Sequence, residues 1–392
     1  MLWRTDTLVS NRARSLLAAL WLAGCAATTD REPQPDEACD VPAGGGVEID
    51  EPLGAGTAVI VGCRREPLVL GEVSDVEQAA PQVVWTGNDF AVGWASGDGY
   101  HIRITNGRGT SNSKHLPGTP SSVSWPPQLL WVNDRLELYY ALSDSVFVDL
   151  IAFAPTGLTV TQTNMIGFGF FRAVQMEPDR IAVLTPTALY VDGAEVGTRY
   201  MGGSALGWNG DNFLVANVTG HGEWRLHGVG LDGSNLPPAI DLVWCGGCST
   251  TGSGGGSAFA SSASAGRHAV VVASDRSLTI AVEGQPAIER ELLAETADAS
   301  MIWDGERYVV LLADQAVAGA GVGRDIGLLA VTADGVLEMA EQPLVPISQD
   351  AAEERYPVGA AARPGDYGIA WIRGNALGGN ELVIQRCALT ER

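Results

Sequence analysis

Short runs of alternating apolar and polar residues, separated by turns that contain glycine, make up most of the chain. The clearest unit covers residues 300–348 and has four apolar runs, at 300–303, 307–312, 326–331 and 336–347. Turns at Asp304-Gly305 and Asp334-Gly335 separate the first run from the second and the third from the fourth. A period of two with many Val, Ile and aromatic residues predicts β-strands, and Asp-Gly pairs between strands favour tight hairpins. We therefore expect four short antiparallel strands, A to D, in this unit.

The end of strand A can be recognised seven times along the chain, at a mean spacing of about 46 residues. These positions are Trp85, Trp131, Met176, Trp208, Ser264, Trp303 and Arg363. A four-stranded propeller blade takes roughly 40–50 residues, and no stretch has a helical period with caps. The repeat predicts an all-β protein, a β-propeller of seven four-stranded blades. Three of the seven positions lack the tryptophan, so six or eight blades remain alternatives at this stage.

The last repeat ends without a fourth strand, which the amino-terminal part of the chain can supply. Residues 66–73 precede the first repeat much as residues 288–295 precede Trp303, so they are expected to complete the last blade. Joining the two ends of the propeller in one sheet closes the ring and removes exposed sheet edges.

Two cysteines are expected in this closing blade. Cys387 should lie near the end of strand C and Cys63 just before strand D, where other blades have a covalent turn. A Cys63–Cys387 disulfide would replace that turn and clamp the ring. The alternative pairing, Cys39–Cys63, would close a local loop instead. Either disulfide suits an exported protein, because export places the thiols in an oxidising environment.

Cys245-Gly246-Gly247-Cys248 is the sharpest local motif. A redox motif would stand at the start of a helix, and a zinc site usually needs a second pair of ligands. Here an apolar run precedes the motif and a Ser/Gly-rich stretch follows it, so we expect a Cys245–Cys248 disulfide that staples a loop. The chain has no Gly-x-Ser-x-Gly, His-Glu-x-x-His or Walker motif. The motifs therefore assign no catalytic residue, no metal ligand and no cofactor.

The amino-terminal segment has the pattern of an export signal. Three arginines precede an apolar run at 15–22, which is too short to span a bilayer as a helix. The run ends at Leu22-Ala23-Gly24-Cys25, which resembles the lipobox of bacterial lipoproteins, whose cysteine carries the lipid. The resemblance implies lipidation at Cys25, and Ala26 after it favours the outer membrane; a plain secretory signal is the alternative. We expect a signal peptide at 1–24, a flexible acidic Pro/Gly tether at 25–56 and a propeller domain at 57–392.

The net charge of −22 disfavours negatively charged binding partners. The predicted signal contains three Arg and one Asp, so the mature chain is near −24. Binding to nucleic acid or to an anionic membrane surface needs clustered cations, which this balance disfavours. We expect a monomer whose contact with a membrane is made through the lipid anchor alone.

Propeller topology indicates where a ligand would bind. The A–B and C–D turns lie on one face of the ring and the B–C and D–A connections on the other. The irregular connections of this chain are B–C and D–A, and function is commonly carried by variable loops on a rigid scaffold. The candidate contacts on that face are His101, Trp125, His221, Trp224, Trp244, Arg324 and Arg373.

The motif Trp-x-Gly-x-Asp-Phe/Tyr with a Val-rich strand after it resembles the repeats of propeller lipoproteins from Gram-negative bacteria. The resemblance covers residues 57–392. It implies a β-propeller fold and a location in the cell envelope, but no catalytic residues. The expected function is a non-enzymatic binding or interaction module for a protein or glycan ligand. A carbohydrate-active hydrolase or lyase on the same scaffold is the first alternative, and a structural envelope protein without a small ligand is the second.

Overall fold

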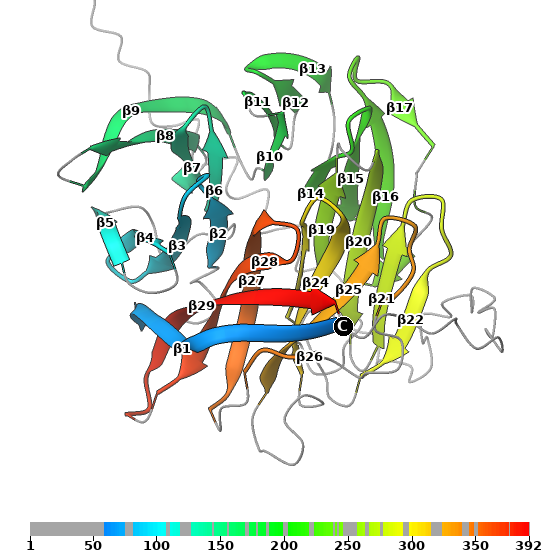
Figure 1. The fold of residues 1–392 in the computed structure, drawn as a ribbon. Helices are drawn as coiled ribbons and strands as arrows, with labels where there is room; N and C mark the ends of the chain where they lie inside the picture. Colours follow the sequence, from blue (N-terminus) through cyan, green and yellow to red (C-terminus); the bar gives the residue numbers. More distant parts are fainter. Residues whose placement is uncertain are drawn as a thin grey trace, which may run out of the picture. The chain divides into compact units, whose positions relative to one another are not determined.

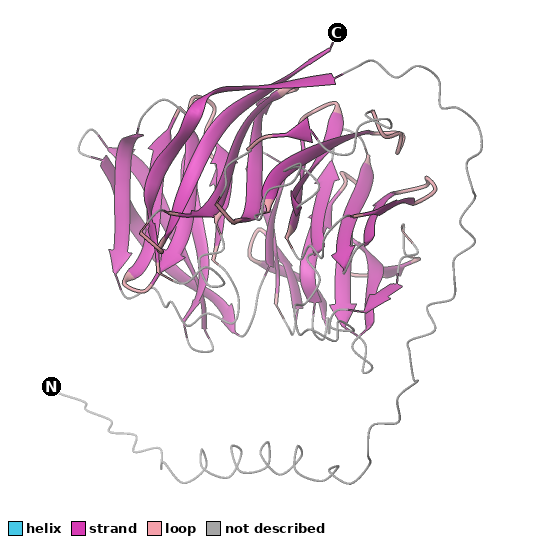
Figure 2. Ribbon diagram, turned by 90° about the horizontal axis from the view of Figure 1, so that it is seen from below, coloured by secondary structure: helices cyan, strands magenta, loops and turns pink. Residues whose placement is uncertain are grey.

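The computed structural model describes residues 59–391 except for short segments, and residues 1–58 and Arg392 lie outside the described part. The segments left out are 75–80, 107–109, 118–126, 143–144, 155–156, 169–171, 178, 186–187, 199–202, 219–222, 238–239, 241–242, 246–256, 263–265, 275–276, 293–297, 315–323, 339–344, 349–351 and 376. The described residues belong to one compact unit, residues 51–392, and form strands and turns (Figure 2). No helix in this part of the chain is long and apolar enough to cross a membrane.

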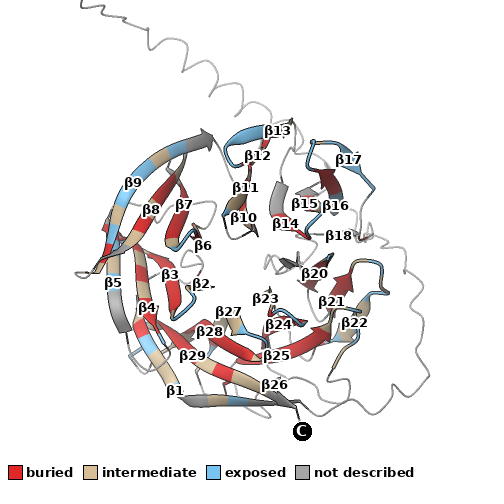
Figure 3. Ribbon diagram, turned by 45° about the horizontal axis from the view of Figure 1, so that its top comes forward, coloured by how far each residue is buried: buried red, intermediate tan, exposed pale blue. Residues whose placement is uncertain are grey.

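The strands form seven antiparallel sheets arranged in a ring (Figures 1 and 3). Blade 1 has β2 (Gln82–Trp85), β3 (Phe90–Ser96), β4 (Gly99–Thr105) and β5 (Thr110–Pro117); blade 2 has β6 (Gln128–Val132), β7 (Arg135–Leu142), β8 (Ser145–Ala154) and β9 (Gly157–Phe168). Blade 3 has β10 (Arg172–Glu177), β11 (Arg180–Leu184), β12 (Ala188–Val191) and β13 (Ala194–Thr198). Blade 4 has β14 (Gly203–Trp208), β15 (Asn212–Val218), β16 (Glu223–Gly230) and β17 (Asn235–Leu236), and β18 (Val243–Cys245) also pairs with β16.

The remaining three blades complete the ring. Blade 5 has β19 (Ser257–Ser262), β20 (Arg267–Ser274), β21 (Ser277–Val282) and β22 (Ile288–Glu291), and blade 6 has β23 (Ala299–Trp303), β24 (Arg307–Asp314), β25 (Asp325–Thr332) and β26 (Val345–Pro346). Blade 7 has β27 (Glu354–Arg363), β28 (Asp366–Gly374), β29 (Asn380–Glu391) and β1 (Val59–Val73). The prediction of a seven-bladed propeller is confirmed, and the alternatives of six or eight blades are wrong.

Strand D of the unit at 300–348 is described only in part, because residues 339–344 lie outside the described residues. The described ladder contains only Val345–Pro346, together with an isolated bridge between Val331 and Leu337. Proline has no N–H to donate to a ladder, so a strand that contains it is confined to the edge of a sheet.

Neighbouring blades bury opposite faces of the same strand. Val309 and Leu311 of β24 belong to the core shared with blade 7, whereas Val310 and Leu312 belong to the core shared with blade 5. Successive side chains of a strand point to opposite faces, and here both faces are covered. Strand B of blade 6 is therefore apolar at every position from 308 to 313, where the side chains are fully buried.

The polar residue after the repeated tryptophan connects one blade to the next. In blade 6, Asp304 Oδ1 accepts hydrogen bonds from the backbone N–H groups of Glu306 (2.9 Å) and Arg307 (2.8 Å), which fixes the A–B turn. Its Oδ2 accepts from Tyr367 OH (2.5 Å) and Gly365 N (3.1 Å) of blade 7. A buried carboxylate needs such donors. The Trp-Asp pair is therefore part of the scaffold.

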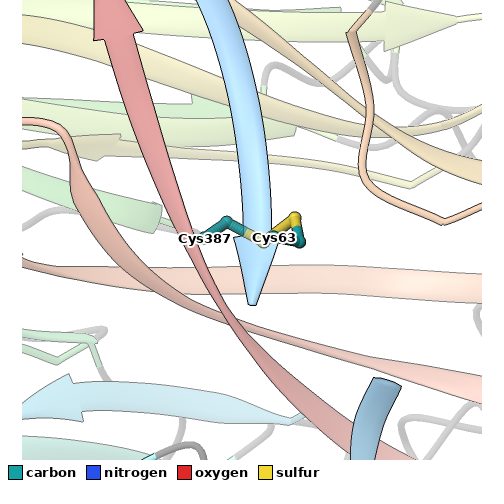
Figure 4. Close-up of a disulfide and its surroundings, with 2 residues drawn as sticks. All are labelled: Cys63 and Cys387. Atoms are coloured by element: carbon teal, nitrogen blue, oxygen red, sulfur yellow. A yellow bond between two sulfur atoms is a disulfide. The ribbon is translucent and has the colours of Figure 1, made fainter. Parts of the chain in front are cut away.

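The ring closes as predicted, by pairing β1 with β29, and a Cys63–Cys387 disulfide joins these two strands (Figure 4). The clamp is confirmed and the alternative Cys39–Cys63 pairing is wrong. The predicted place of Cys63 was also wrong. It lies inside β1, directly opposite Cys387, because β1 begins at Val59 and pairs with β29 as far as Glu391. The disulfide therefore joins two strands within their ladder and does not stand in for a turn.

Candidate functional site

Hydrogen bonds join loops that connect strands B and C to loops that connect strand D with strand A of the next blade. Gly97 N, between β3 and β4, donates to Ser74 Oγ, which follows β1 (3.1 Å). Gly374 N, at the end of β28, donates to the carbonyl oxygen of Glu353, which precedes β27 (3.0 Å). These contacts support the expectation that the two kinds of connection share one face of the propeller. We call this side the loop face.

A hollow of about 340 Å³ lies on the loop face of blade 7, between the start of β27 and the turn from β28 to β29. It is lined by Glu353, Arg355, Ile372, Gly374, Asn375, Gly378, Gly379 and Asn380. We call it the blade-7 hollow. Its lining combines one arginine, one carboxylate and two amides with three glycines, which leave backbone accessible.

The turn that forms one wall of the hollow is held by Asn375. Asn375 Oδ1 accepts from the backbone N–H groups of Leu377 (3.0 Å) and Gly379 (2.9 Å), and Gly378 has a φ of 80°. Asparagine stabilises turns in this way, and glycine adopts a positive φ without strain. Asn375 Nδ2 has no hydrogen-bond acceptor among the described residues. The oxygen of this amide therefore holds the turn in place.

The opposite wall carries an ion pair. Arg355 Nε and Nη2 lie 3.0 and 2.6 Å from Glu353 Oε1, and this hydrogen bond is the main cause that raises the pKa of Arg355. Within the described part of the chain, Arg355 Nη1 and Glu353 Oε2 make no hydrogen bond. The hollow thus offers an oriented cationic donor beside a carboxylate acceptor, the combination that binds hydroxyl, amide or carboxylate groups.

A buried carboxyl group belongs to the same region. Asp298 precedes β23 and is 7% exposed, and burial raises its pKa. Its Oδ2 lies 3.4 Å from Tyr356 N and 4.0 Å from Arg324 Nη1, and Arg355 and Glu353 are close enough to shift its pKa by their charges. Tyr356 has a φ of 53°, an uncommon value for a residue other than glycine.

The structure brings two of the predicted contacts to this region. Arg324 lies beside Asp298, and Arg373 pairs with Glu381 at 2.7 Å across β28 and β29. His101 lies apart from them, on blade 1. Trp224 and Trp244 are opposite each other in the β16–β18 pairing, but their side chains are outside the described part. Trp125 and His221 also lie outside the described residues.

The structure also leaves two of the cysteine predictions untested. Cys25 and Cys248 lie outside the described residues, and only the backbone of Cys245 is described, in β18. Lipidation and the Cys245–Cys248 disulfide therefore stay predictions. Reasoning from the sequence named neither Arg355 nor Asn375, although the Gly/Asn-rich segment between β28 and β29 was a signal for the turn.

No protein-family model matches the sequence, and neither does any curated protein. Among solved structures, the chain is similar to the WD40 domain of Toxoplasma gondii coronin, with a TM-score of 0.52 and 8% identity over 86% of this chain and 88% of that one. A protein of unknown function from Dyadobacter fermentans covers 84% of this chain and 99% of its own, at 10% identity and a TM-score of 0.46. Trypanosoma rangeli sialidase covers 80% and 55%, at 8% identity and a TM-score of 0.40. At these identities the comparisons show a β-propeller fold and nothing of the function.

Proposed function

We propose that this protein is a lipid-anchored, extracytoplasmic binding module whose blade-7 hollow takes a polar, hydroxyl-rich ligand such as a glycan. One observation carries the proposal: the hollow contains hydrogen-bonding atoms to which no described residue makes a hydrogen bond, namely Arg355 Nη1, Glu353 Oε2 and Asn375 Nδ2. Binding sites orient ligands with a small number of such polar groups on a rigid frame.

The lining of the hollow supports binding in preference to hydrolysis. Glycoside hydrolysis generally uses two carboxyl groups on either side of the bond that breaks. The hollow is lined by a single carboxylate, Glu353, whose side chain is about half exposed (51%) and forms an ion pair with Arg355. Such a carboxylate is suited to accepting hydrogen bonds from a ligand.

A glycan array probed with the full chain tests this proposal. We expect selective binding, and we expect Arg355→Ala and Asn375→Ala each to weaken it by about 10-fold, because a lost charged or buried hydrogen bond costs roughly 1.5 kcal/mol. Arg363→Ala is the matched control, because Arg363 is 79% exposed at an A–B turn on the other face, and it should leave affinity unchanged. Absence of binding to any glycan, or unchanged affinity in both hollow variants, would contradict the proposal and favour a structural envelope role.

A hydrolase is the second candidate, because Asp298 is a buried carboxyl group with a raised pKa close to Glu353. Glycosidases use two carboxyl groups, and the pKa of the one that acts as general acid is raised by its environment. Incubation of the bound glycan with the protein separates the two functions. A hydrolase would release product, and Asp298→Asn would abolish that release. The binding module would leave the glycan intact.

Lipid anchoring is tested separately at Cys25. Expression of the full chain in a Gram-negative host with a radioactive or clickable palmitate should label the protein, and Cys25→Ala should remove the label, because the thiol is the acceptor of the diacylglyceryl group. Cys39→Ala is the control, since it removes a nearby cysteine from the same predicted tether. Equal labelling of the Cys25→Ala protein would refute the anchor without affecting the proposed ligand site.

A further inference from the structure

Two histidines and an aspartate converge at the outer part of blade 1 on the loop face. His101 on β4 and His115 on β5 are opposite each other in the ladder, and Asp98 lies in the turn that leads into β4. His101 Nε2 is 2.9 Å from Asp98 Oδ1, and His115 Nε2 is 3.3 Å from Asp98 Oδ2. One ligand atom from each of the three residues lies within 4.8 Å of the other two.

The histidine rings are held in position by stacking. Trp94, His101 and His115 occupy matching positions on β3, β4 and β5, so their rings form a row across the sheet. Ring centroids are 5.1 Å apart for Trp94 and His101 and 4.5 Å apart for the two histidines, with planes within 17° and 15° of parallel. Trp94 is 2% exposed and gives the row a rigid base. Both Nε2 atoms are therefore presented to one point without further ordering of the side chains.

The turn is shaped to bring the carboxylate to these nitrogens. Gly99 has a φ of 145°, and a Cβ atom there would lie 2.3 Å from the Leu116 carbonyl oxygen and 3.1 Å from His115 Nε2. Ser96 Oγ hydrogen-bonds to Asp98 Oδ1 and lies 2.8 Å from His101 Nε2. These contacts orient the carboxylate of Asp98 toward the two imidazole rings.

We infer that Asp98, His101 and His115 form a binding site for a divalent transition-metal ion of the kind that imidazole prefers, with Zn²⁺ as the reference ion. Bonds of about 2.0 Å in a tetrahedral arrangement place neighbouring ligand atoms roughly 3.3 Å apart. The separations from His101 Nε2 to Asp98 Oδ1 (2.9 Å) and from His115 Nε2 to Asp98 Oδ2 (3.3 Å) are near that spacing, and one ligand atom from each residue lies within 4.8 Å of the other two. Two imidazoles and a carboxylate favour Zn²⁺, Cu²⁺ or Ni²⁺ over Ca²⁺ and Mg²⁺, which prefer oxygen ligands.

The residues around the three ligands indicate the coordination and the affinity of the proposed metal site. Three protein ligands leave a fourth position, which faces solvent because His115 and Asp98 are 41% and 64% exposed. Ligating histidines usually donate their other ring N–H to a protein partner, which strengthens the site. The described residues provide no such partner at Nδ1 of His101 or His115. We therefore expect micromolar affinity and an open coordination position, as in a site that exchanges its ion or binds an external ligand.

The test is titration calorimetry of the full chain with ZnSO₄, after alkylation of free thiols so that no thiolate competes. We expect one Zn²⁺ per chain. His101→Gln and His115→Gln should each weaken binding by about 10-fold or more. His227→Gln is the matched control, an exposed histidine on β16 outside the cluster, and should change affinity less than about twofold. Circular dichroism of each variant verifies that it is folded.

X-ray absorption of the zinc-loaded wild type provides a readout that does not depend on variants. We expect a first shell of nitrogen and oxygen at about 2.0 Å, with the signature of imidazole and no sulfur. The site is ruled out by wild-type protein that binds no Zn²⁺ at 100-µM protein and metal, by a sulfur shell, or by equal affinities of the two cluster variants and the control. In those cases the three side chains form only a surface hydrogen-bond network.

Discussion

Reduction of the Cys63–Cys387 disulfide is expected to lower the free energy of unfolding by about 4 kcal/mol. The bond joins residues 324 positions apart, so it restricts almost the whole propeller in the unfolded state. In the chain-entropy account, the stabilisation grows with the length of the closed loop. In the folded state, the same bond holds β1 on the outer edge of blade 7, where no covalent turn connects it to β29.

The measurement is urea unfolding of the protein with and without a phosphine reductant, followed by tryptophan fluorescence. Comparing two redox forms of one sequence avoids the cavity that an alanine would leave at Cys387, which is 1% exposed. The effect of the reductant should persist in Cys245→Ala/Cys248→Ala protein and vanish in Cys63→Ala/Cys387→Ala protein. An unchanged unfolding midpoint, with complete reduction verified by mass spectrometry, would show that the ladder between β1 and β29 closes the ring by itself.

Acidification from pH 6.5 to pH 4 is expected to destabilise the protein by about 3 kcal/mol through His268 alone. His268 on β20 is fully buried between blades 4 and 5, and burial lowers its pKa from 6.5 to about 4. Its Nε2 lies 3.0 Å from Asn212 Oδ1, and its backbone N–H donates to Glu283 Oε2 at 3.0 Å. The unfolded chain takes up a proton below about pH 6.5, whereas the folded chain does so only near pH 4. The stabilisation is therefore complete above pH 6.5 and is lost as the pH falls.

The contribution of His268 to the pH dependence of stability is measured by comparing the wild type with a His268→Gln variant. Urea unfolding of wild type and His268→Gln at pH 7, 5.5 and 4.5 should give two curves that converge on acidification, because glutamine does not titrate. His227→Gln serves as the control, since the side chain of His227 is exposed and its curve should run parallel to that of the wild type. If His268→Gln were as acid-sensitive as the wild type, His268 would not be the group responsible.

The same polar links between blades explain why the repeat could be found in the sequence. Asn209 occupies the position of Asp304 in blade 4: its Oδ1 accepts from Asp211 N and Asn212 N at 3.0 Å, and its Nδ2 donates to Glu283 Oε2 of blade 5 at 3.1 Å. Trp208 and Phe213 then pack at 4.6 Å, as Trp303 and Tyr308 do at 4.7 Å. Blades 4 and 6 thus fix the A–B turn and contact the next blade through residues at the same positions of the repeat, so the arrangement is visible as a sequence pattern.

The sequence by itself predicted the strands, the repeated four-stranded unit and the closing strand, because period-two alternation, turn residues and repeat spacing are local properties of the chain. It left six or eight blades and the Cys39–Cys63 pairing as alternatives, and the tertiary structure settled seven blades and the Cys63–Cys387 pairing. Only the tertiary structure decided which polar groups meet. Arg355 and Asn375 are brought together by the meeting of β27 with the turn after β28, and His101 and His115 by the register of β4 and β5. A shift of one residue in that register would turn one ring to the other face of the sheet. Such registers are set by the packing of whole blades, which no single stretch of sequence records.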